Sequence, residues 1–303
     1  MNSSLTPTSG LIPLIDACVV IVNFNAGGSI LVDCIASVLA CPSLKAIIVD
    51  NASRDDSLAI VEQTFTAHPR LRLIRNSTNL GFAAACNIGA NVCQTDYLLF
   101  LNPDCRLEAD TLPNLQTALA SAPDVGMVGG LLLNPDGTEQ AGGRRAIPTP
   151  WRTFIRAFGL SRLLPHYFRD YDLHLQPLPA EPVEVEAISG ACMLVRHDVF
   201  EQLSGWDQNY FLHCEDLDIC MRFRQGGWKI LFVPTARVPH LKGVCSKSRP
   251  IFVEWHKHRG MMRFYRKFFR HQYPGALMWL VRLGVWLRFG GIALVYSLRQ
   301  LRT

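Results

Sequence analysis

The chain has 303 residues, of which 49% are hydrophobic, so it is long enough for one large core or for a core with an appendage, and extensive disorder is excluded. The 30 Lys and Arg residues outnumber the 25 Asp and Glu residues, but many cations lie in residues 256–272 and in the tail beyond. This distribution indicates a local anionic partner rather than a basic protein throughout. The polar start, residues 1–16, lacks the layout of a secretory signal, and we expect it to be flexible.

The first third of the chain alternates between short β-branched runs and segments of helical spacing. Strands are predicted at 17–24, 45–50, 71–75 and 97–101, and helices at 29–39, 58–67 and 81–92. This alternation predicts an α/β fold with an open, mostly parallel sheet, which gathers ligands at the carboxyl ends of its strands.

The rest of the chain continues this pattern less regularly. Further strands are predicted at 126–133, 183–188, 190–195 and 228–233, and helices at 151–158, 198–203 and 215–225. Residues 134–137 form a turn, and residues 144–182 form a long irregular excursion of the kind that is usually functional or mobile.

The ten cysteines are scattered through the chain without a C-x-x-C pair, mostly inside apolar segments. This spacing suggests neither a zinc site nor a disulfide framework. We therefore expect small buried thiols in a reducing compartment, and a cytoplasmic protein.

Two acidic residues follow predicted strands, where a parallel sheet places its ligand. Asp50 closes one apolar run, although it could also begin a turn, because Ser53 and Asp56 resemble a helix N-cap box, and both interpretations can hold. Asp104 closes another run in Asn102-Pro103-Asp104. A divalent cation bound to a diphosphate needs only one or two protein carboxylates, so Asp104 is a candidate metal ligand, with the start of the next helix as its structural alternative.

A third acidic site, Glu215-Asp216, opens a predicted helix. A carboxylate at that place can act as a general base on a hydroxyl group, whereas a lone acidic pair at a helix start usually caps it. The functional interpretation is favoured by the polar and aromatic neighbours Trp206, Asp207, Asp218, Arg222 and His240.

Asn79, Gly81 and Asn87 mark a stretch where the backbone can approach a ligand and a helix N-terminus can face phosphate. The chain has neither a G-x-G-x-x-G fingerprint nor a G-K-[ST] loop, so hydride transfer and P-loop phosphoryl transfer lose their main support. Nucleotidyl transfer is disfavoured as well, because the segment 25–28 after the first strand lacks a cation.

Together these motifs resemble the inverting family 2 glycosyltransferases, and more narrowly their bacterial rhamnosyltransferase branch. The similarity extends over residues 17–246, about three quarters of the chain. The matching segments are Val22-Asn23-Phe24-Asn25, Val49-Asp50-Asn51-Ala52-Ser53, Asn79-Leu80-Gly81-Phe82-Ala83, Leu101-Asn102-Pro103-Asp104, Gly190-Ala191-Cys192-Met193, Gly205-Trp206-Asp207 and Glu215-Asp216-Leu217-Asp218 with Arg222.

The resemblance implies a GT-A fold over residues 17–250, a nucleotide-sugar donor, and Mg²⁺ or Mn²⁺. It also implies a role for each site residue: Asp216 as the catalytic base; Asp104 and His240 at the metal; Asn23, Asn25, Asp50, Asn79, Gly81, Asn87 and Asn102 at the donor; Trp206, Asp207, Glu215, Asp218 and Arg222 in support of the acceptor side. Asn102 replaces the first acid of the D-x-D motif, which leaves the metal with one fewer charge. The excursion at 144–182 is expected to border the acceptor.

The activity implied by the resemblance is the transfer of one sugar, rhamnose from dTDP-rhamnose, to a lipid-linked or polysaccharide acceptor in cell-surface glycan synthesis. Single-sugar transfer is favoured because the Q-x-x-R-W motif of processive synthases is absent. The alternative is a catalytically idle module that binds nucleotide sugar or tethers an assembly complex. The retained trio Asp50, Asp104 and Asp216 argues against idleness.

The tail, residues 251–303, interleaves cations with aromatic rings and continues as an apolar helix over 277–298. Arg282 and Arg288 near its middle make a membrane span expensive, so we expect an amphipathic interfacial helix on the anionic inner face of the cell membrane. Packing of this helix on the protein's own core is the alternative. A nucleic-acid partner is not expected, because the tail shows no groove-facing pattern.

Overall fold

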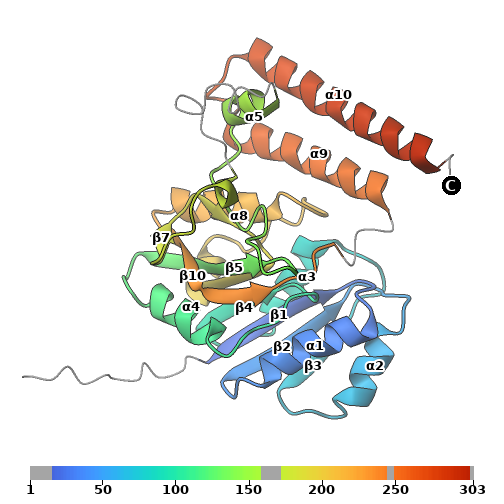
Figure 1. The fold of residues 1–303 in the computed structure, drawn as a ribbon, viewed down its shortest axis with the longest axis vertical. Helices are drawn as coiled ribbons and strands as arrows, with labels where there is room; N and C mark the ends of the chain where they lie inside the picture. The colour runs from blue at the N-terminus through green and yellow to red at the C-terminus, as the bar shows by residue number, and fades with distance from the viewer. Residues whose placement is uncertain (1–15, 158–171, 244–248, 301–303) are drawn as a thin grey trace, which may run out of the picture.

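The computed structural model describes residues 16–157, 172–243 and 249–300, which fold around one large sheet (Figure 1). Eight strands form this sheet in the order β3-β2-β1-β4-β9-β5-β10-β7, and β6 pairs with β8. The strands are β1 (Ala17–Asn23), β2 (Leu44–Asp50), β3 (Leu71–Arg75), β4 (Tyr97–Leu101), β5 (Val125–Leu133), β6 (Arg144–Arg145), β7 (Val183–Glu184), β8 (Ala187–Ile188), β9 (Cys192–Arg196) and β10 (Lys229–Pro239).

Helices cover both faces of the sheet. They are α1 (Gly28–Leu39), α2 (Ser57–Thr64), α3 (Phe82–Ala90), α4 (Thr111–Leu119), α5 (Pro150–Ala157), α7 (His197–Gln202), α8 (Glu215–Gln225), α9 (Pro250–Phe268) and α10 (Gly275–Gln300), with a 3₁₀ turn at Leu173–Leu175. Each element predicted over residues 17–101 is present, as is the helix that begins at Glu215.

The expected α/β class is confirmed, with a sheet that is mixed but mostly parallel. β3, β2, β1 and β4 run parallel to one another, and β10 runs parallel to β5. β9 lies antiparallel between β4 and β5, and β7 lies antiparallel to β10 at the edge. The antiparallel β9 brings residues 190 and 191, which precede it, to the edge where β4 ends.

The core has two layers, one on each face of the sheet, because successive side chains of a strand point to opposite faces. On β1, Val19 and Ile21 pack in the layer under α1, α2 and α4. Val20 and Val22 pack in the opposite layer, with α3, α8 and α9. All seven residues of β1 are buried, as expected for a central parallel strand.

Two local predictions are wrong, and one helix was not predicted. β10 continues past Val233 to Pro239, because a register shift between Val233 and Arg237 accommodates Pro234, which cannot donate to the ladder. The run 183–188 divides into β7 and β8, which join different sheets. Helix α4 is not predicted, although its Pro113 lies in the first turn, where a missing N–H costs no helical bond.

The expectation of unpaired cysteines is also wrong in one place, because Cys18 and Cys93 form a disulfide. Helix α3 packs closely against β1 at Gly89, where a Cβ would touch the Val20 side chain, and this approach brings Cys93 next to the start of the strand. The other cysteines in the described segments are free. Cys245 and residues 1–15 of the predicted flexible start lie outside the described residues.

The apolar helix predicted over 277–298 is present as α10, and α9 precedes it. α9 buries Phe264 and Tyr265 in the same core layer as α3 and α8. α10 packs along α9 and lies farther from the sheet (Figure 1). The C-terminal region therefore contributes one helix to the core and carries a second helix outside it.

Candidate active site

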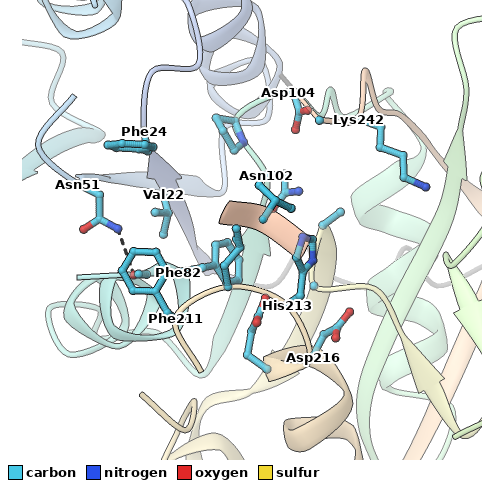
Figure 2. A pocket seen from close by; sticks show the side chains of 18 of the residues that line it. Val22, Phe24, Asn51, Phe82, Asn102, Asp104, Phe211, His213, Asp216 and Lys242 are labelled. Atoms are coloured by element: carbon cyan, nitrogen blue, oxygen red, sulfur yellow. Dashed lines mark hydrogen bonds between the residues drawn. The ribbon is translucent and has the colours of Figure 1, made fainter. Parts of the chain in front are cut away.

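A cavity of about 1180 Å³ lies at the carboxyl edge of the parallel strands. The loops after β1, β2, β3 and β4 line it together with the N-terminus of α8, the end of β10 and the first turns of α9. Figure 2 shows Asn51 and Phe24 at one end and Asp216 at the other, with Asp104 and Lys242 beside each other. The cavity therefore lies where the sheet topology predicts a ligand.

Eight of the predicted site residues line this cavity, and seven do not. Those that line it are Asn25, Asn79, Gly81, Asn102, Asp104, Glu215, Asp216 and His240. Those that lie outside the lining are Asn23, Asp50, Asn87, Trp206, Asp207, Asp218 and Arg222. The three acidic sites of the sequence thus come together, and two of them, Asp104 and Asp216, border the same space.

Asp50 lies beneath the cavity and shapes the loop above it. It is 3% exposed, and its carboxylate accepts hydrogen bonds from Asn23 Nδ2 at 2.8 Å and from the backbone N–H of Ser53 at 3.0 Å. Ser53 itself lines the cavity, as does Arg54, whose N–H donates to Asn25 Oδ1 at 2.7 Å. The turn interpretation of Asp50 thus holds, whereas the N-cap box is wrong, because α2 begins at Ser57 without a side-chain cap from its N-cap residue.

Gly81 is where α3 begins and where the backbone approaches another loop most closely. Its φ is +85°, and a Cβ there would stand 2.6 Å from the carbonyl oxygen of Phe211, so the position requires glycine. Asn79 Oδ1 accepts the N–H of Gly81 at 2.9 Å, and Asn51 Nδ2 donates to the carbonyl of Gly81 at 3.0 Å. The close approach at this glycine is therefore to the backbone of the 211–214 turn, and the predicted approach to a ligand stays a prediction.

Asp104 and His240 line the cavity and face each other directly. Asp104 Oδ1 lies 3.2 Å from His240 Nε2, and both side chains are buried. Their loops are joined by a backbone bond from the N–H of Leu241 to the carbonyl of Asp104 at 3.0 Å. This bond holds Asp104 and His240 together, although they are 136 positions apart in the sequence.

Gln140, which sequence patterns did not indicate, fixes the tautomer of His240. Gln140 is 2% exposed, and its Nε2 donates to Asn134 Oδ1 at 3.1 Å and to the His240 carbonyl at 3.3 Å. Its Oε1 therefore faces His240 Nδ1, at 2.7 Å, and accepts a hydrogen bond from the Nδ1–H group. The lone pair of His240 Nε2 is then directed at the carboxylate of Asp104.

An imidazole lone pair and a carboxylate that face each other favour a cation between them, so these two residues fit a divalent ion. Cys105 Sγ is also near both, but burial, followed by the charge of Asp104, raises the pKa of this thiol well above its usual value. A protonated thiol is a poor ligand. The candidate metal ligands are therefore Asp104 and His240, as the resemblance implies.

The catalytic-base candidate, Asp216, stands in the first turn of α8. Its Oδ1 accepts the N–H of Leu217 at 2.8 Å, and its Oδ2 forms an ion pair with Arg145. Arg145 lines the cavity from the beginning of the excursion at 144–182, the segment expected to border the acceptor. No sequence motif singled out this arginine, although the Arg-rich composition of the segment was visible.

The turn that delivers this helix, residues 211–214, is strained. His213 and Cys214 have φ values of +67° and +69°, which side chains other than glycine rarely adopt. The turn is held between two helices: the N–H of Phe82 on α3 donates to the Phe211 carbonyl at 2.9 Å, and Gly260 on α9 packs directly on His213. Tight packing from both sides thus holds the turn that positions Asp216.

Burial shifts the pKa values of two groups beside Asp216. Burial, followed by the charge of Asp216, raises the pKa of Glu215 to about 8. Burial, followed by the charge of Lys257, lowers the pKa of His213 to about 4, so its imidazole is neutral near pH 7. Perturbed groups that border a cavity are typical of functional sites.

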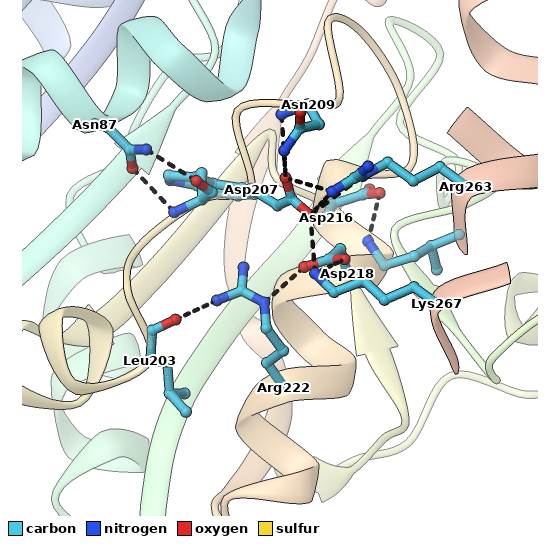
Figure 3. A network of polar contacts seen from close by, with 11 residues as sticks. Asn87, Leu203, Asp207, Asn209, Asp216, Asp218, Arg222, Arg263 and Lys267 are labelled. Carbon is cyan, nitrogen blue, oxygen red and sulfur yellow. Dashed lines mark hydrogen bonds and ion pairs between the residues drawn. The ribbon is translucent and has the colours of Figure 1, made fainter. Parts of the chain in front are cut away.

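Three of the predicted supporting residues, Asp207, Asp218 and Arg222, form a polar network outside the cavity lining (Figure 3). Lys267 on α9 bridges Asp207, at 2.9 Å, and Asp218, at 2.6 Å. Arg263 also pairs with Asp207, at 2.8 Å, and Arg222 pairs with Asp218 at 2.6 Å. These residues connect α8 to α9 and do not border the space where a substrate would lie.

Trp206 and Asn87 also lie outside the cavity lining and support the surrounding structure. Asn87 donates to the Trp206 carbonyl and accepts its N–H, both at 2.9 Å. The Trp206 ring is buried and packs edge-on against Phe82 and Phe100. Trp206 thus supports α3, the helix that begins at the cavity.

Comparison with known proteins gives a consistent result. The family model described as "Glycosyl transferase family 2" matches residues 18–204. Among curated proteins, the N-acetylglucosaminyl-diphospho-decaprenol L-rhamnosyltransferase of Mycobacterium tuberculosis (strain CDC 1551 / Oshkosh) is 28% identical over 221 residues, which cover 68% of this chain and 69% of that protein.

Two solved structures share the fold. GalNAc-T7 with UDP, GalNAc and Mn²⁺ has a TM-score of 0.62 at 20% identity, over 84% of this chain and 48% of that one, so this chain spans about half its length. The mannosyltransferase PcManGT from Pyrobaculum calidifontis, in complex with GDP-Man and Mn²⁺, has a TM-score of 0.58 at 16% identity, over 94% of this chain and 75% of that one. These likenesses confirm the GT-A architecture expected from the sequence.

Proposed function

The chain belongs to glycosyl transferase family 2, and from this premise we propose that it transfers a single sugar, with inversion, from a nucleotide-sugar donor to a lipid-linked or polysaccharide acceptor. The relative in Mycobacterium tuberculosis is named a rhamnosyltransferase, which supports rhamnose from dTDP-rhamnose as the donor. The observation that carries the proposal is that Asp104 and Asp216 line one cavity.

In this proposal the donor nucleotide lies along the loops after β1, β2 and β3, where Asn25, Asn51 and Asn79 border the cavity. Asp104 and His240 would hold Mg²⁺ or Mn²⁺, which would neutralise the leaving diphosphate. Asp50 and Asn23 act indirectly, by holding the Ser53 loop.

Asp216 removes the proton from the acceptor hydroxyl. The acceptor oxygen forms its bond to the anomeric carbon as the bond from that carbon to the diphosphate breaks, and the proton ends on the Asp216 carboxylate. Arg145 lies beside this carboxylate and compensates its charge before the acceptor enters. The raised pKa of Glu215 leaves its side chain mostly uncharged near pH 7, so a single anion faces the acceptor.

We further propose that the enzyme works at the inner face of the cell membrane, in cell-surface glycan synthesis. Two observations support this place: the relative in Mycobacterium tuberculosis is named for a diphospho-decaprenol acceptor, and α10 is an apolar helix outside the core. The alternative, an idle nucleotide-sugar-binding module, is disfavoured by the shared cavity of Asp104 and Asp216.

The experiment that tests the function compares Asp216→Asn with the wild-type chain. The variant should bind the donor normally, measured as metal-dependent thermal stabilisation by dTDP-rhamnose, but should lose sugar transfer by at least about a thousandfold. Asp110→Asn is the matched control, because Asp110 is exposed and makes no side-chain cap bond. Wild-type turnover by Asp216→Asn would remove the proposed base, and a panel of nucleotide sugars with no stabilising member would remove the proposed donor class.

A further inference from the structure

Helix α10 has one face that packs on the protein and one that does not. Met278, Val281 and Val285 pack towards the core side, and Trp286 and Phe289 stack with Trp255 of α9, at ring distances of 5.0 and 5.5 Å. These positions recur every three or four residues and therefore share one side of the helix. α10 is thus fixed in rotation about its own axis by α9.

The opposite side of α10 is exposed and apolar except at Ser297. The large side chains on it recur at the same helical spacing and are between 41% and 66% exposed: Trp279, Leu280, Leu283, Leu287, Leu294 and Leu298. Ala276, Gly290 and Gly291 lie between them. We call this stripe, from residue 276 to residue 298, the outward face. A stripe of this length is roughly 33 Å long at about 1.5 Å per residue, and exposed apolar surface of that extent marks an interaction site.

The cations of α10 lie at the margins of the packed side and not in the outward face. Arg282 is four residues from Met278 and three from Val285, and Arg288 is three residues from Val285. Both arginines are exposed. Their aliphatic stems can therefore lie along the apolar face while their charged ends remain in water.

The charge around this face is almost entirely positive. Over residues 250–303 the sequence has one acidic residue, Glu254, against ten Lys and Arg residues. Arg259, Arg266 and Arg270 of this set lie on exposed positions of α9 and the turn after it. An apolar stripe bordered by cations complements a bilayer with anionic headgroups better than it complements a protein, whose surface carries both signs of charge.

We propose that the outward face of α10 lies flat in the headgroup region of an anionic bilayer, so that the protein is held in the membrane interface and does not cross it. By length and composition Gly275–Arg299 could also span a membrane. A span would bring Arg282 and Arg288 into the hydrocarbon and would require α10 to leave Trp255, whereas the flat arrangement keeps the contacts with α9. The inference provides a physical means for the membrane location proposed above, and uses none of the cavity residues.

This arrangement also places the catalytic site relative to the membrane. α9 lies between α10 and the cavity, and its first turns, with Phe252 and Lys257, line the cavity wall. The same helix thus contacts the membrane-bound helix on one side and borders the proposed acceptor end on the other. A lipid-linked acceptor would reach the cavity past the N-terminal end of α9.

The test is flotation of the full-length protein with vesicles, comparing wild type with the double variant Leu283→Glu, Leu287→Glu. The control carries the same added charge on the exposed α9–α10 connection, as His271→Glu with Gln272→Glu. Wild type and control should float with phosphatidylglycerol-containing vesicles and bind much less to pure phosphatidylcholine. The bound fraction of the Leu283→Glu, Leu287→Glu variant should fall by about tenfold or more.

Topology is tested with epitope tags at both ends of the chain in sealed membrane vesicles. Both tags should be equally accessible to protease, since both ends lie on one side of an interfacial protein. Accessibility of one tag alone would establish a span and overturn the proposal. If the wild-type protein formed dimers in solution but did not bind vesicles, and the two glutamates dissociated these dimers, the outward face would be a contact with a second copy. That result would also overturn the proposal. Donor stabilisation measured on the same samples shows whether the proposed function stands independently.

Discussion

Gly260 offers a direct test of how the base is positioned, because it is the point where α9 touches the strained 211–214 turn. An added Cβ would lie 2.7 Å from the His213 carbonyl oxygen and 3.3 Å from Cys214 Cβ. Ordinary contact begins near 3.4 Å, so Gly260→Ala must displace the turn or the helix by about 0.7 Å. Both neighbours of the new methyl group belong to the turn that delivers Asp216.

The expected magnitude follows from two opposed effects. Overpacking of this kind costs about 1–3 kcal/mol, whereas replacing glycine with alanine inside a helix gains about 0.5–1 kcal/mol. We therefore expect a net loss of about 1–2 kcal/mol in the free energy of unfolding, measured by urea denaturation. A displacement approaching 1 Å at a catalytic group can lower kcat by about 10- to 100-fold, and donor affinity should be unchanged.

Gly284→Ala is the matched control, since Gly284 is also helical but a Cβ added there would have no atom within 4 Å. This variant should be as stable as wild type or slightly more stable, with normal kcat. If Gly260→Ala behaved like Gly284→Ala in both stability and turnover, the reasoning that α9 holds the 211–214 turn would be refuted.

Three further predictions concern single contacts. Gln140→Met should weaken Mn²⁺ binding by about 10- to 100-fold, because His240 loses the acceptor that fixes its tautomer; unchanged binding in a Mn²⁺ titration followed by electron paramagnetic resonance would contradict this. The wild-type protein should lose stability as pH rises from about 4.5 to 8, because the pKa of Glu215 is raised on folding and the unfolded chain therefore ionises first. Glu215→Gln should abolish this loss. Parallel pH profiles of the free energy of urea unfolding in the two proteins would contradict the prediction. Lys267→Met should lower the free energy of unfolding by about 2–4 kcal/mol, because it leaves the buried carboxylate of Asp218 and the partly buried carboxylate of Asp207 with one partner fewer. Lys229→Met, at a surface ion pair, should cost much less, and equal losses in the two variants would contradict this prediction.

Much of the sheet could be predicted because its central strands are continuous β-branched runs. β1 and β2 are buried on both faces, and strands of this kind can be recognised from their composition alone. β9 was predicted as a strand, but its antiparallel direction depends on the long connection through the excursion at 144–182, and local sequence does not encode it. The predicted strand stopped at Val233, and the following Pro234 is a local signal against a central strand. The register shift that accommodates this proline is not visible in the local sequence.

The candidate site divides in the same way. Asp104 and Asp216 were predictable because each follows an element boundary that the sequence marks clearly. Gln140 and Arg145 were not, because each acts through a partner 71 to 100 residues away and stands in a segment without periodicity. Asp207 and Asp218 stand out in the sequence as polar neighbours of the base, but only coordinates show that their partners are on α9 and not in the cavity.

The contrast between α9 and α10 decides where the protein can be shortened. A chain that stopped before Pro250 would lose Phe264 and Tyr265 from its interior and one wall of the catalytic pocket, and would expose an open core to aggregation. A chain that stopped after Tyr273 would keep the interior and the pocket and would lose mainly the apolar helix α10. Truncation after Tyr273 is therefore the better choice for preparing a sample that does not aggregate and is suitable for crystallisation.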